Sequence, residues 1–284
     1  MNHARVSRTL SYVWVRETLG LMAAQEHQPL AMEVQKAVQA DPDRALCLWF
    51  LPSSVRHAAY VLLAFHNELI RALAPARSAA VAGPMAGYIR LQWWREVLEG
   101  QRKPEHILAP ALMALVQSGQ VQRDTCLRMV AAREMELEAA QDVEHWMLMM
   151  RDGAGTFQQA IGELLGVHDE VTLQRLAAGG AAYGAGTMLR HWPLLAGSGR
   201  FLFPGTQEQL RQVGKTFLQE CHFEALEPRC RKAVLPVVLA KRDLARGSEQ
   251  AGLPRGIGDR LAVCHAGIQA SLATIFSITP IRTE

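Results

Sequence analysis

The chain lacks paired cysteines, long apolar runs and a strong excess of charge of either sign. No apolar run approaches the roughly 18 to 20 residues that a helix needs to cross a bilayer, so we expect a soluble or peripheral protein. The five cysteines are an odd number without a CxxC pair, which argues against a disulfide framework and a zinc site and favours a reducing compartment. The net charge of +3 is too small to indicate nucleic-acid binding.

Short catalytic signatures are also missing. The sequence contains no HExxH, GxSxG, GxxxxGK[ST] or GxGxxG pattern, and none of its ten histidines stands at a zinc-like spacing from a cysteine. The sequence therefore contains no motif that would indicate a hydrolase, a nucleotide-binding protein or a zinc enzyme of these classes.

Strand-like alternation is almost absent, and Ala, Leu, Glu, Gln, Arg and Met dominate between Gly and Pro, which predicts an all-α protein. The first clear helix follows Pro52, with Ser53 or Ser54 as its cap, and ends before Pro75. Its predicted core face comprises Val55, Ala59, Leu62, Phe65, Leu69 and Leu73.

Further helices follow along the chain. Residues 124–150 form one helix or two with a kink near Asp142, and a helix from about Asp169 runs through Leu195. The glycines at 179, 180, 184 and 186 on that helix permit close approach by a neighbour or a ligand. The other helices are expected after Pro84, between Pro104 and Gly119, and over about 207–227, 231–246 and 256–278.

We expect one helical domain over 44–284, preceded by an extension over 1–43 that is transit-like or poorly ordered. Residues 1–25 contain Arg5, Arg8 and Arg16 with several hydroxyls and no acid before Glu17, a composition typical of organelle transit peptides. An ordinary ragged terminus, or a start codon assigned upstream of Met22 or Met32, explains the same residues.

Glu134, Glu138 and Asp142 recur at every fourth position and would share one face of a helix. Carboxylates at this spacing can hold Mg²⁺, although an acidic stripe is more often the solvated side of a helix. Arg90 and Arg95 flank Trp93 and Trp94 and can bind an anion or simply pack beside the indole rings.

Four segments in register resemble the squalene/phytoene synthase family, from about Arg44 to the C-terminus. They are FLPSSVRHAAYVLLAF (50–65), GYIRLQWWRE (87–96), residues 131–166, and AAYGAGTMLRHWPLLAGSGRFLFP (181–204). The resemblance implies an isoprenoid-synthase-type helical bundle around a central cavity. Enzymes of this family join two prenyl diphosphates head to head, with Mg²⁺ held by two aspartate-rich motifs that face each other across the cavity.

In this register the aspartates of both motifs are replaced. The first motif falls on Ile70, Arg71 and Ala74, with only Glu68 nearby, and the second falls on His191 and Leu195. No metal site is therefore predicted, and no catalytic residue is assigned. The resemblance leaves Glu68, Arg90, Arg95, Glu136, Arg190 and Arg200 as cavity or anion-binding candidates.

The loss of both motifs resembles the branch that contains the mitochondrial complex I assembly factor six and its bacterial relatives. It implies a non-catalytic assembly factor for respiratory NADH dehydrogenase, or a helper that binds a lipid or isoprenoid. Such a protein needs no cofactor and would lie in the bacterial cytoplasm, at the inner-membrane periphery, or on the mitochondrial matrix side.

Two alternatives stay open. A divergent head-to-head prenyl transferase of isoprenoid biosynthesis would find Mg²⁺ through Glu68, Glu134, Glu136, Glu138 or Asp142. An unrelated helical interaction module would use its tryptophans only to pack a core, but it leaves four family segments in order without an explanation.

Overall fold

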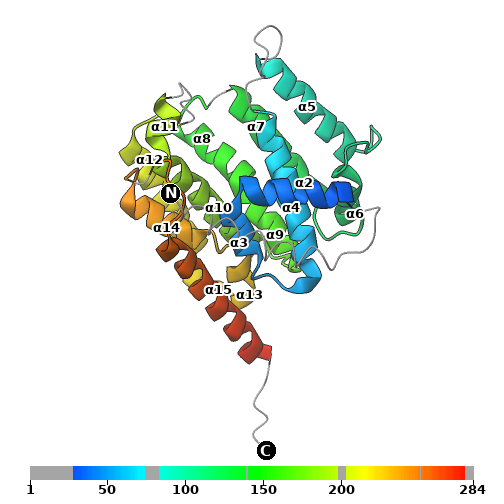
Figure 1. Cartoon of the computed structure of the whole chain (residues 1–284). Coiled ribbons are helices and arrows are strands. Elements are labelled where there is room, and N and C mark those ends of the chain that lie inside the picture. Colours follow the sequence, from blue (N-terminus) through cyan, green and yellow to red (C-terminus); the bar gives the residue numbers. More distant parts are fainter. Residues whose placement is uncertain (1–27, 74–82, 139, 198–202, 250, 279–284) are drawn as a thin grey trace, which may run out of the picture.

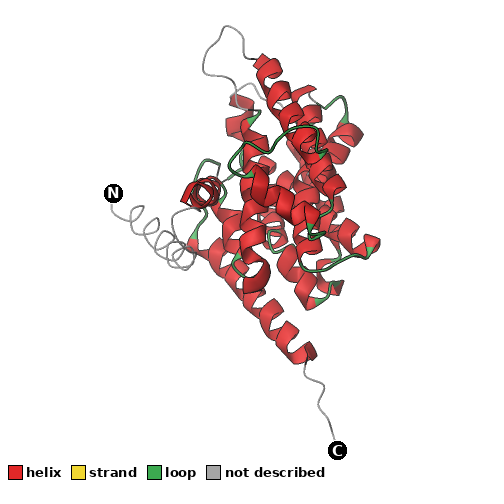
Figure 2. Ribbon diagram, turned by 90° about the vertical axis from the view of Figure 1, so that its right-hand side faces the viewer, coloured by secondary structure: helices red, strands yellow, loops and turns green. Residues whose placement is uncertain are grey.

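A computed structural model describes residues 28–73, 83–138, 140–197, 203–249 and 251–278. This part of the chain is built from helices joined by loops and contains no strand (Figure 2). The expected all-α class is confirmed. Helices α5 (Gly83–Leu98) and α15 (Ile257–Ile278) lie at opposite ends of the bundle (Figure 1).

The remaining α-helices have the following bounds: α2 Gln28–Ala40, α3 Pro42–Leu48, α4 Ser53–Arg71, α6 Ala109–Gln117, α7 Arg123–Glu138, α8 Val143–Met150, α9 Thr156–Leu164, α10 Glu170–Arg190, α11 Trp192–Gly197, α12 Gln207–Cys221, α13 Pro228–Ala233 and α14 Val237–Arg246. A π-helical turn, Arg151–Gly155, joins α8 to α9.

Helix α10 is the centre of the packing and contacts α9, α12, α14 and the π-helical turn. Its small residues make this possible: a methyl group added at Gly180 would clash with the carbonyl oxygen of Ala154 in the π-helical turn. Because a backbone carbonyl cannot rotate away as a side chain can, glycine is required at this crossing. The predicted close approach along α10 thus serves helix packing.

Helix α4 supplies much of one hydrophobic core. Leu62, Phe65 and Leu69 are completely buried, as their spacing predicts, and Phe65 meets Trp94 of α5 edge to face, with ring centroids 5.1 Å apart. The predicted serine cap is wrong, because Pro52 occupies the N-cap position and no side chain caps the helix.

Of the two alternatives for residues 124–150, two helices are present, and the break between them ends at Asp142. Helix α7 ends at Glu138, and Asp142 caps α8 by accepting a 2.7 Å hydrogen bond from the backbone N–H of His145. A side chain that bonds the backbone in this way favours a helix start over a helix interior.

The expectation that the helix from Asp169 runs unbroken through Leu195 is wrong. Helix α10 ends at Arg190, and α11 begins at Trp192. Pro193 has no N–H to donate to the carbonyl of Leu189, and its ring would crowd that carbonyl in a regular helix. The chain therefore bends at His191.

Helical structure begins ahead of residue 44. Helix α2 packs against α4, and α3 packs against both. Residues 1–27 lie outside the described part of the chain. Within that part, no helix is both long and apolar enough to span a membrane.

Candidate functional site

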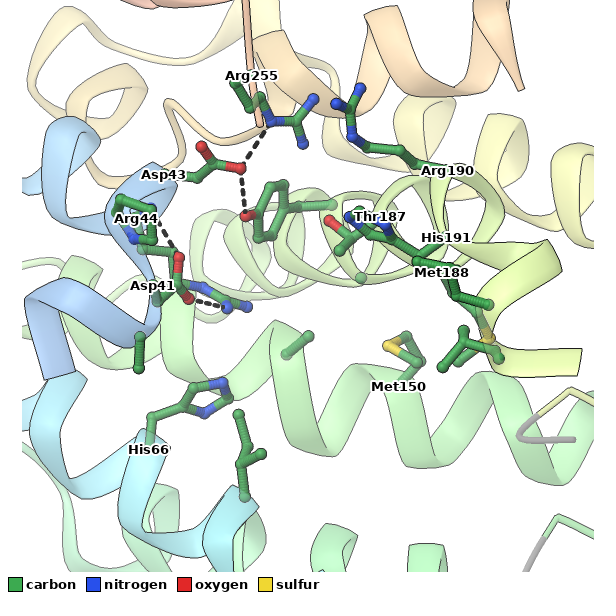
Figure 3. A pocket seen from close by; sticks show the side chains of 18 of the residues that line it. Asp41, Asp43, Arg44, His66, Met150, Thr187, Met188, Arg190, His191 and Arg255 are labelled. Atoms are coloured by element: carbon green, nitrogen blue, oxygen red, sulfur yellow. Dashed lines mark hydrogen bonds and ion pairs between the residues drawn. The ribbon is translucent and has the colours of Figure 1, made fainter. Parts of the chain in front are cut away.

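A cavity of about 670 Å³ opens between α3 and α4 on one side and α10, α11 and the segment before α15 on the other. Figure 3 shows His66 on one wall, Thr187, Met188 and Met150 on another, and Arg190 and Arg255 along the edge. Its other lining residues include Asp41, Asp43, Arg44, Ile70, Arg133, Glu136, Met149, Tyr183, His191, Leu194, Leu195, Leu253, Pro254 and Arg260.

The structure brings together three positions at which the family resemblance placed aspartates. Ile70 of α4 lines the cavity, and so do His191 and Leu195 at the bend between α10 and α11. Arg71 does not line it; its guanidinium is half exposed and pairs with Glu68 at 3.0 Å. Ala74 lies outside the described residues.

Three of the predicted anion-binding candidates are placed elsewhere. Glu68 is buried beside Arg71, Arg90 is exposed and donates to the backbone carbonyl of Arg71, and Arg95 pairs with Glu134 of α7. None of the three lines the cavity. Arg200 lies outside the part of the chain that the structure describes.

Glu136 and Arg190 do line the cavity, and each has a charged partner. Glu136 accepts a hydrogen bond from Arg133, three residues earlier on α7. Arg190 is buried, donates to the carbonyl of Leu253 at 2.9 Å and lies 3.7 Å from Asp243. The charges of Glu136 and Arg190 are therefore already paired within the protein.

The most extensive polar contacts at the cavity involve residues that the sequence did not single out. Arg255 donates from Nε to Asp43 at 2.6 Å and from its two terminal nitrogens to Asp243 at 2.6 and 2.7 Å. Burial alone would lower the pKa of Arg255, but these carboxylates raise it above its ordinary value. Arg255 is therefore a permanent cation that fastens α3 and α14 to the segment before α15.

A second ion pair closes the α3 side of the cavity. Asp41 caps α3 through the N–H of Arg44 and also accepts from the Arg44 guanidinium at 2.7 Å. That guanidinium lies over the rings of Phe157 and Tyr183, at 5.1 and 4.7 Å from their centroids. An aspartate immediately before a proline at a helix start was the one signal in the sequence for this arrangement.

Two histidines at the cavity have lowered pKa values. Burial, followed by the positive charges of Arg44 and Arg133, holds the pKa of His66 well below its usual range. For His191, burial and then Arg190 and Arg255 lower the pKa. Both imidazoles are accordingly neutral near pH 7. His191 Nδ1 accepts a 3.3 Å hydrogen bond from the N–H of Gly252.

The residues at the cavity do not fit the Mg²⁺ sites of the family. Asp41, Asp43 and Glu136 each contact an arginine, so no lining carboxylate is left for a cation that prefers several oxygen ligands. Among the described residues, no three His, Cys, Asp or Glu side chains gather as a metal site would require.

The predicted acidic stripe does not converge on the cavity either. Glu134 pairs with Arg95, the exposed Glu138 accepts from the hydroxyl of Tyr88, and Asp142 caps α8. None of the three acids is among the cavity-lining residues.

Comparisons with known proteins identify the fold from one solved structure and the family from a family model. The chain is similar in structure to squalene synthase HpnC from Alicyclobacillus acidocaldarius, with a TM-score of 0.61 and 13% sequence identity over 80% of this chain and 96% of that one. At this identity the likeness establishes the all-α isoprenoid-synthase-type fold. No curated protein has significant sequence similarity to the chain. The family model for squalene/phytoene synthases matches residues 37–250. The chain therefore belongs to the squalene/phytoene synthase family.

Proposed function

We propose that this protein is a non-catalytic member of its family that binds a lipid or isoprenoid in the cavity and helps to assemble respiratory NADH dehydrogenase. The observation that supports it best is the shared location of Ile70, His191 and Leu195 on the wall of one cavity. In the register of the resemblance these positions face each other as the two metal-binding motifs do. Here they supply two aliphatic side chains and a neutral imidazole.

Charge argues against diphosphate chemistry in the cavity. A departing diphosphate is a strongly charged anion, and metal ions neutralise it as a carbocation forms. The lining offers no unpaired carboxylate among its described residues to hold such ions, because Asp41, Asp43 and Glu136 are each bound by arginine. The described lining therefore offers no free carboxylate with which to hold metal ions against a departing diphosphate.

Ligand binding is supported by the size and lining of the cavity. Its volume of about 670 Å³ lies within the roughly 300–1,000 Å³ of small-molecule sites. Methionine and leucine side chains form much of the wall, including Met149, Met150, Met188, Leu194 and Leu195. Flexible methionines adapt to apolar ligands of irregular shape.

The assembly role rests on the resemblance to the branch of complex I assembly factors. Its partners would be NADH dehydrogenase subunits or assembly intermediates, met at the inner-membrane periphery or in the bacterial cytoplasm, or on the matrix side in a mitochondrion. No resident cofactor is part of this function.

Membership of the family favours one alternative, a divergent head-to-head prenyl transferase. It would require Glu68, Glu134, Glu136, Glu138 or Asp142 to gather around a cation. Among these acids only Glu136 lines the cavity, and it is paired with Arg133. The non-catalytic function is the better match to these positions.

Two experiments test the proposal. Incubation with farnesyl or geranylgeranyl diphosphate and Mg²⁺ should release no diphosphate above background; release that EDTA abolishes would establish the enzyme instead. Deletion in the native host should reduce the amount of assembled NADH dehydrogenase on native gels, and a plasmid copy should restore it. Unchanged assembly in the deletion strain would refute the assembly role.

A further inference from the structure

The charged groups of the cavity form ion pairs with one another, although Arg44 Nε and Arg133 Nε have no hydrogen-bond partner among the described residues. Two uncharged polar groups of the lining also lack a hydrogen-bond partner within that part of the chain. Four lining arginines contact a carboxylate: Arg44 with Asp41, Arg133 with Glu136, and Arg190 and Arg255 with Asp243. Arg255 also holds Asp43. An incoming anion would have to compete with these carboxylates for the guanidinium groups.

His66 is the first unsatisfied group. Its side chain is 2% exposed, lies on the wall formed by α4, and stacks at a tilt on Phe157 with 5.0 Å between ring centroids. Its Nδ1 is buried and has no hydrogen-bond partner among the described residues. Leaving such an atom unpaired is unfavourable, and a bound ligand that supplies a hydrogen-bond partner removes this penalty.

The imidazole of His66 selects for an uncharged partner. Burial, followed by the charges of Arg44 and Arg133, lowers its pKa, so the ring is neutral near pH 7 and offers one N–H donor and one acceptor nitrogen. A ligand hydroxyl group can form a hydrogen bond with either ring nitrogen, and a ligand carbonyl oxygen can accept one from the ring N–H. A diphosphate would need positively charged groups to bind it, and Arg44 and Arg133 are already paired with carboxylates.

Thr187 is the second unsatisfied group, and it lies on α10, away from His66 in Figure 3. Its Oγ1 is buried and has no hydrogen-bond partner within the described part of the chain. The surface that the two residues share includes Met150, Met188 and Leu195. Apolar side chains thus lie between the two unpaired polar groups, His66 Nδ1 and Thr187 Oγ1.

We propose that the cavity binds an uncharged, largely apolar molecule with a hydroxyl or carbonyl oxygen that bonds to His66. This inference rests on the proposed function and names the ligand class for the same cavity. This ligand class differs from the diphosphate substrates of catalytic relatives. The groups that would recognise it are a neutral imidazole and a hydroxyl, whereas metal ions bind the diphosphates.

Equilibrium dialysis of the full chain tests the inference with three probes that share one carbon skeleton. Farnesol has a hydroxyl, farnesene has no oxygen, and farnesyl diphosphate is charged; all three are measured without Mg²⁺. We expect farnesol to bind at least tenfold more tightly than either of the others. The substitution His66→Leu should raise the Kd for farnesol about tenfold and leave that for farnesene unchanged.

His168→Leu is the matched control, since His168 is exposed and is not among the cavity-lining residues. It should change none of the three constants. If His66→Leu does not fold, judged by circular dichroism, Thr187→Val provides a second variant of nearly equal shape, and it should also weaken farnesol more than farnesene.

Each contrary result has a distinct meaning. Absence of farnesol binding, tighter binding of farnesyl diphosphate, or equal effects of both variants on farnesol and farnesene would overturn the inference. Tight diphosphate binding without turnover would still leave a non-catalytic binding protein. Only Mg²⁺-dependent release of diphosphate would refute the non-catalytic function itself.

Discussion

Arg255 donates a 2.6 Å hydrogen bond to Asp43 across 212 residues of sequence. The same guanidinium engages both carboxylate oxygens of Asp243, whose side chain is completely buried. One cation thereby joins the start of the helical bundle to its last third at the edge of the cavity. A bidentate pair of this kind fixes orientation as well as charge.

Removal of the Arg255 cation should lower the stability of the folded protein. The substitution Arg255→Gln leaves Asp243 buried with only the more distant Arg190, and we expect the free energy of unfolding to fall by about 3 kcal/mol. Urea denaturation followed by circular dichroism measures the change. Arg229→Gln removes an exposed ion pair with Glu227 and should cost less than about 1 kcal/mol. Equal losses in the two variants would contradict the importance of the buried pair.

Gly180→Ala tests the close crossing of α10 and the π-helical turn. The added methyl group would meet the carbonyl oxygen of Ala154, so we expect destabilisation by about 1–3 kcal/mol in a urea titration. Gly197→Ala is the control because a methyl group there meets no atom within 4 Å, and its effect should stay within about 0.5 kcal/mol. A neutral Gly180→Ala variant would show that the helices can separate without loss.

Filling the cavity should exclude its ligand. Leu195 lines the wall at the bend before α11, and Leu195→Trp adds bulk toward the space that farnesol would occupy. We expect the Kd for farnesol to rise at least tenfold in equilibrium dialysis. Leu272→Trp, on the exposed face of α15, should leave it unchanged. An unaltered Kd for Leu195→Trp would place farnesol outside this cavity.

Acid should weaken the fold through His66. Its pKa is lowered in the folded protein, so the unfolded chain takes up this proton first as the pH falls. The stabilising effect of the neutral ring is therefore complete above its unfolded pKa of about 6.5 and is lost progressively below it, by up to about 1.4 kcal/mol per pH unit.

The matched variants His66→Gln and His168→Gln measure this contribution. Free energies of unfolding between pH 7 and pH 5 should fall less steeply in His66→Gln than in the parent protein. His168→Gln, which replaces an exposed histidine outside the cavity lining, is the control substitution. Parallel slopes in all three proteins would mean that His66 is protonated as readily in the folded state as in the unfolded one.

Local signals in the sequence were sufficient for much of the fold. The apolar spacing on α4 placed Leu62, Phe65 and Leu69 in the core, and the acid at 142 marked a helix boundary. The break after Arg190 was missed because the apolar pattern continues across Pro193, while the missing N–H of proline interrupts the backbone bonds.

The site was only partly accessible from the sequence. Motif register found Ile70, His191 and Leu195, which line the cavity. It could not find Arg255, because the partners Asp43 and Asp243 become neighbours only through folding. His66 was one of ten histidines without a motif, and it is distinguished by a buried Nδ1 that has no hydrogen-bond partner among the described residues, which no local pattern encodes.

The bend at His191 has a consequence for any redesign toward metal chemistry. On a straight helix, residues four positions apart lie on one ridge, and two carboxylates there can grip the same ion. Here α10 stops at Arg190 and α11 starts at Trp192, but the backbone N–H of Leu195 donates to the carbonyl of His191 at 3.1 Å, so acids introduced at 191 and 195 would lie one helical turn apart at the start of α11. Such a redesign would therefore act on the side chains and could leave the backbone at Pro193 as it is.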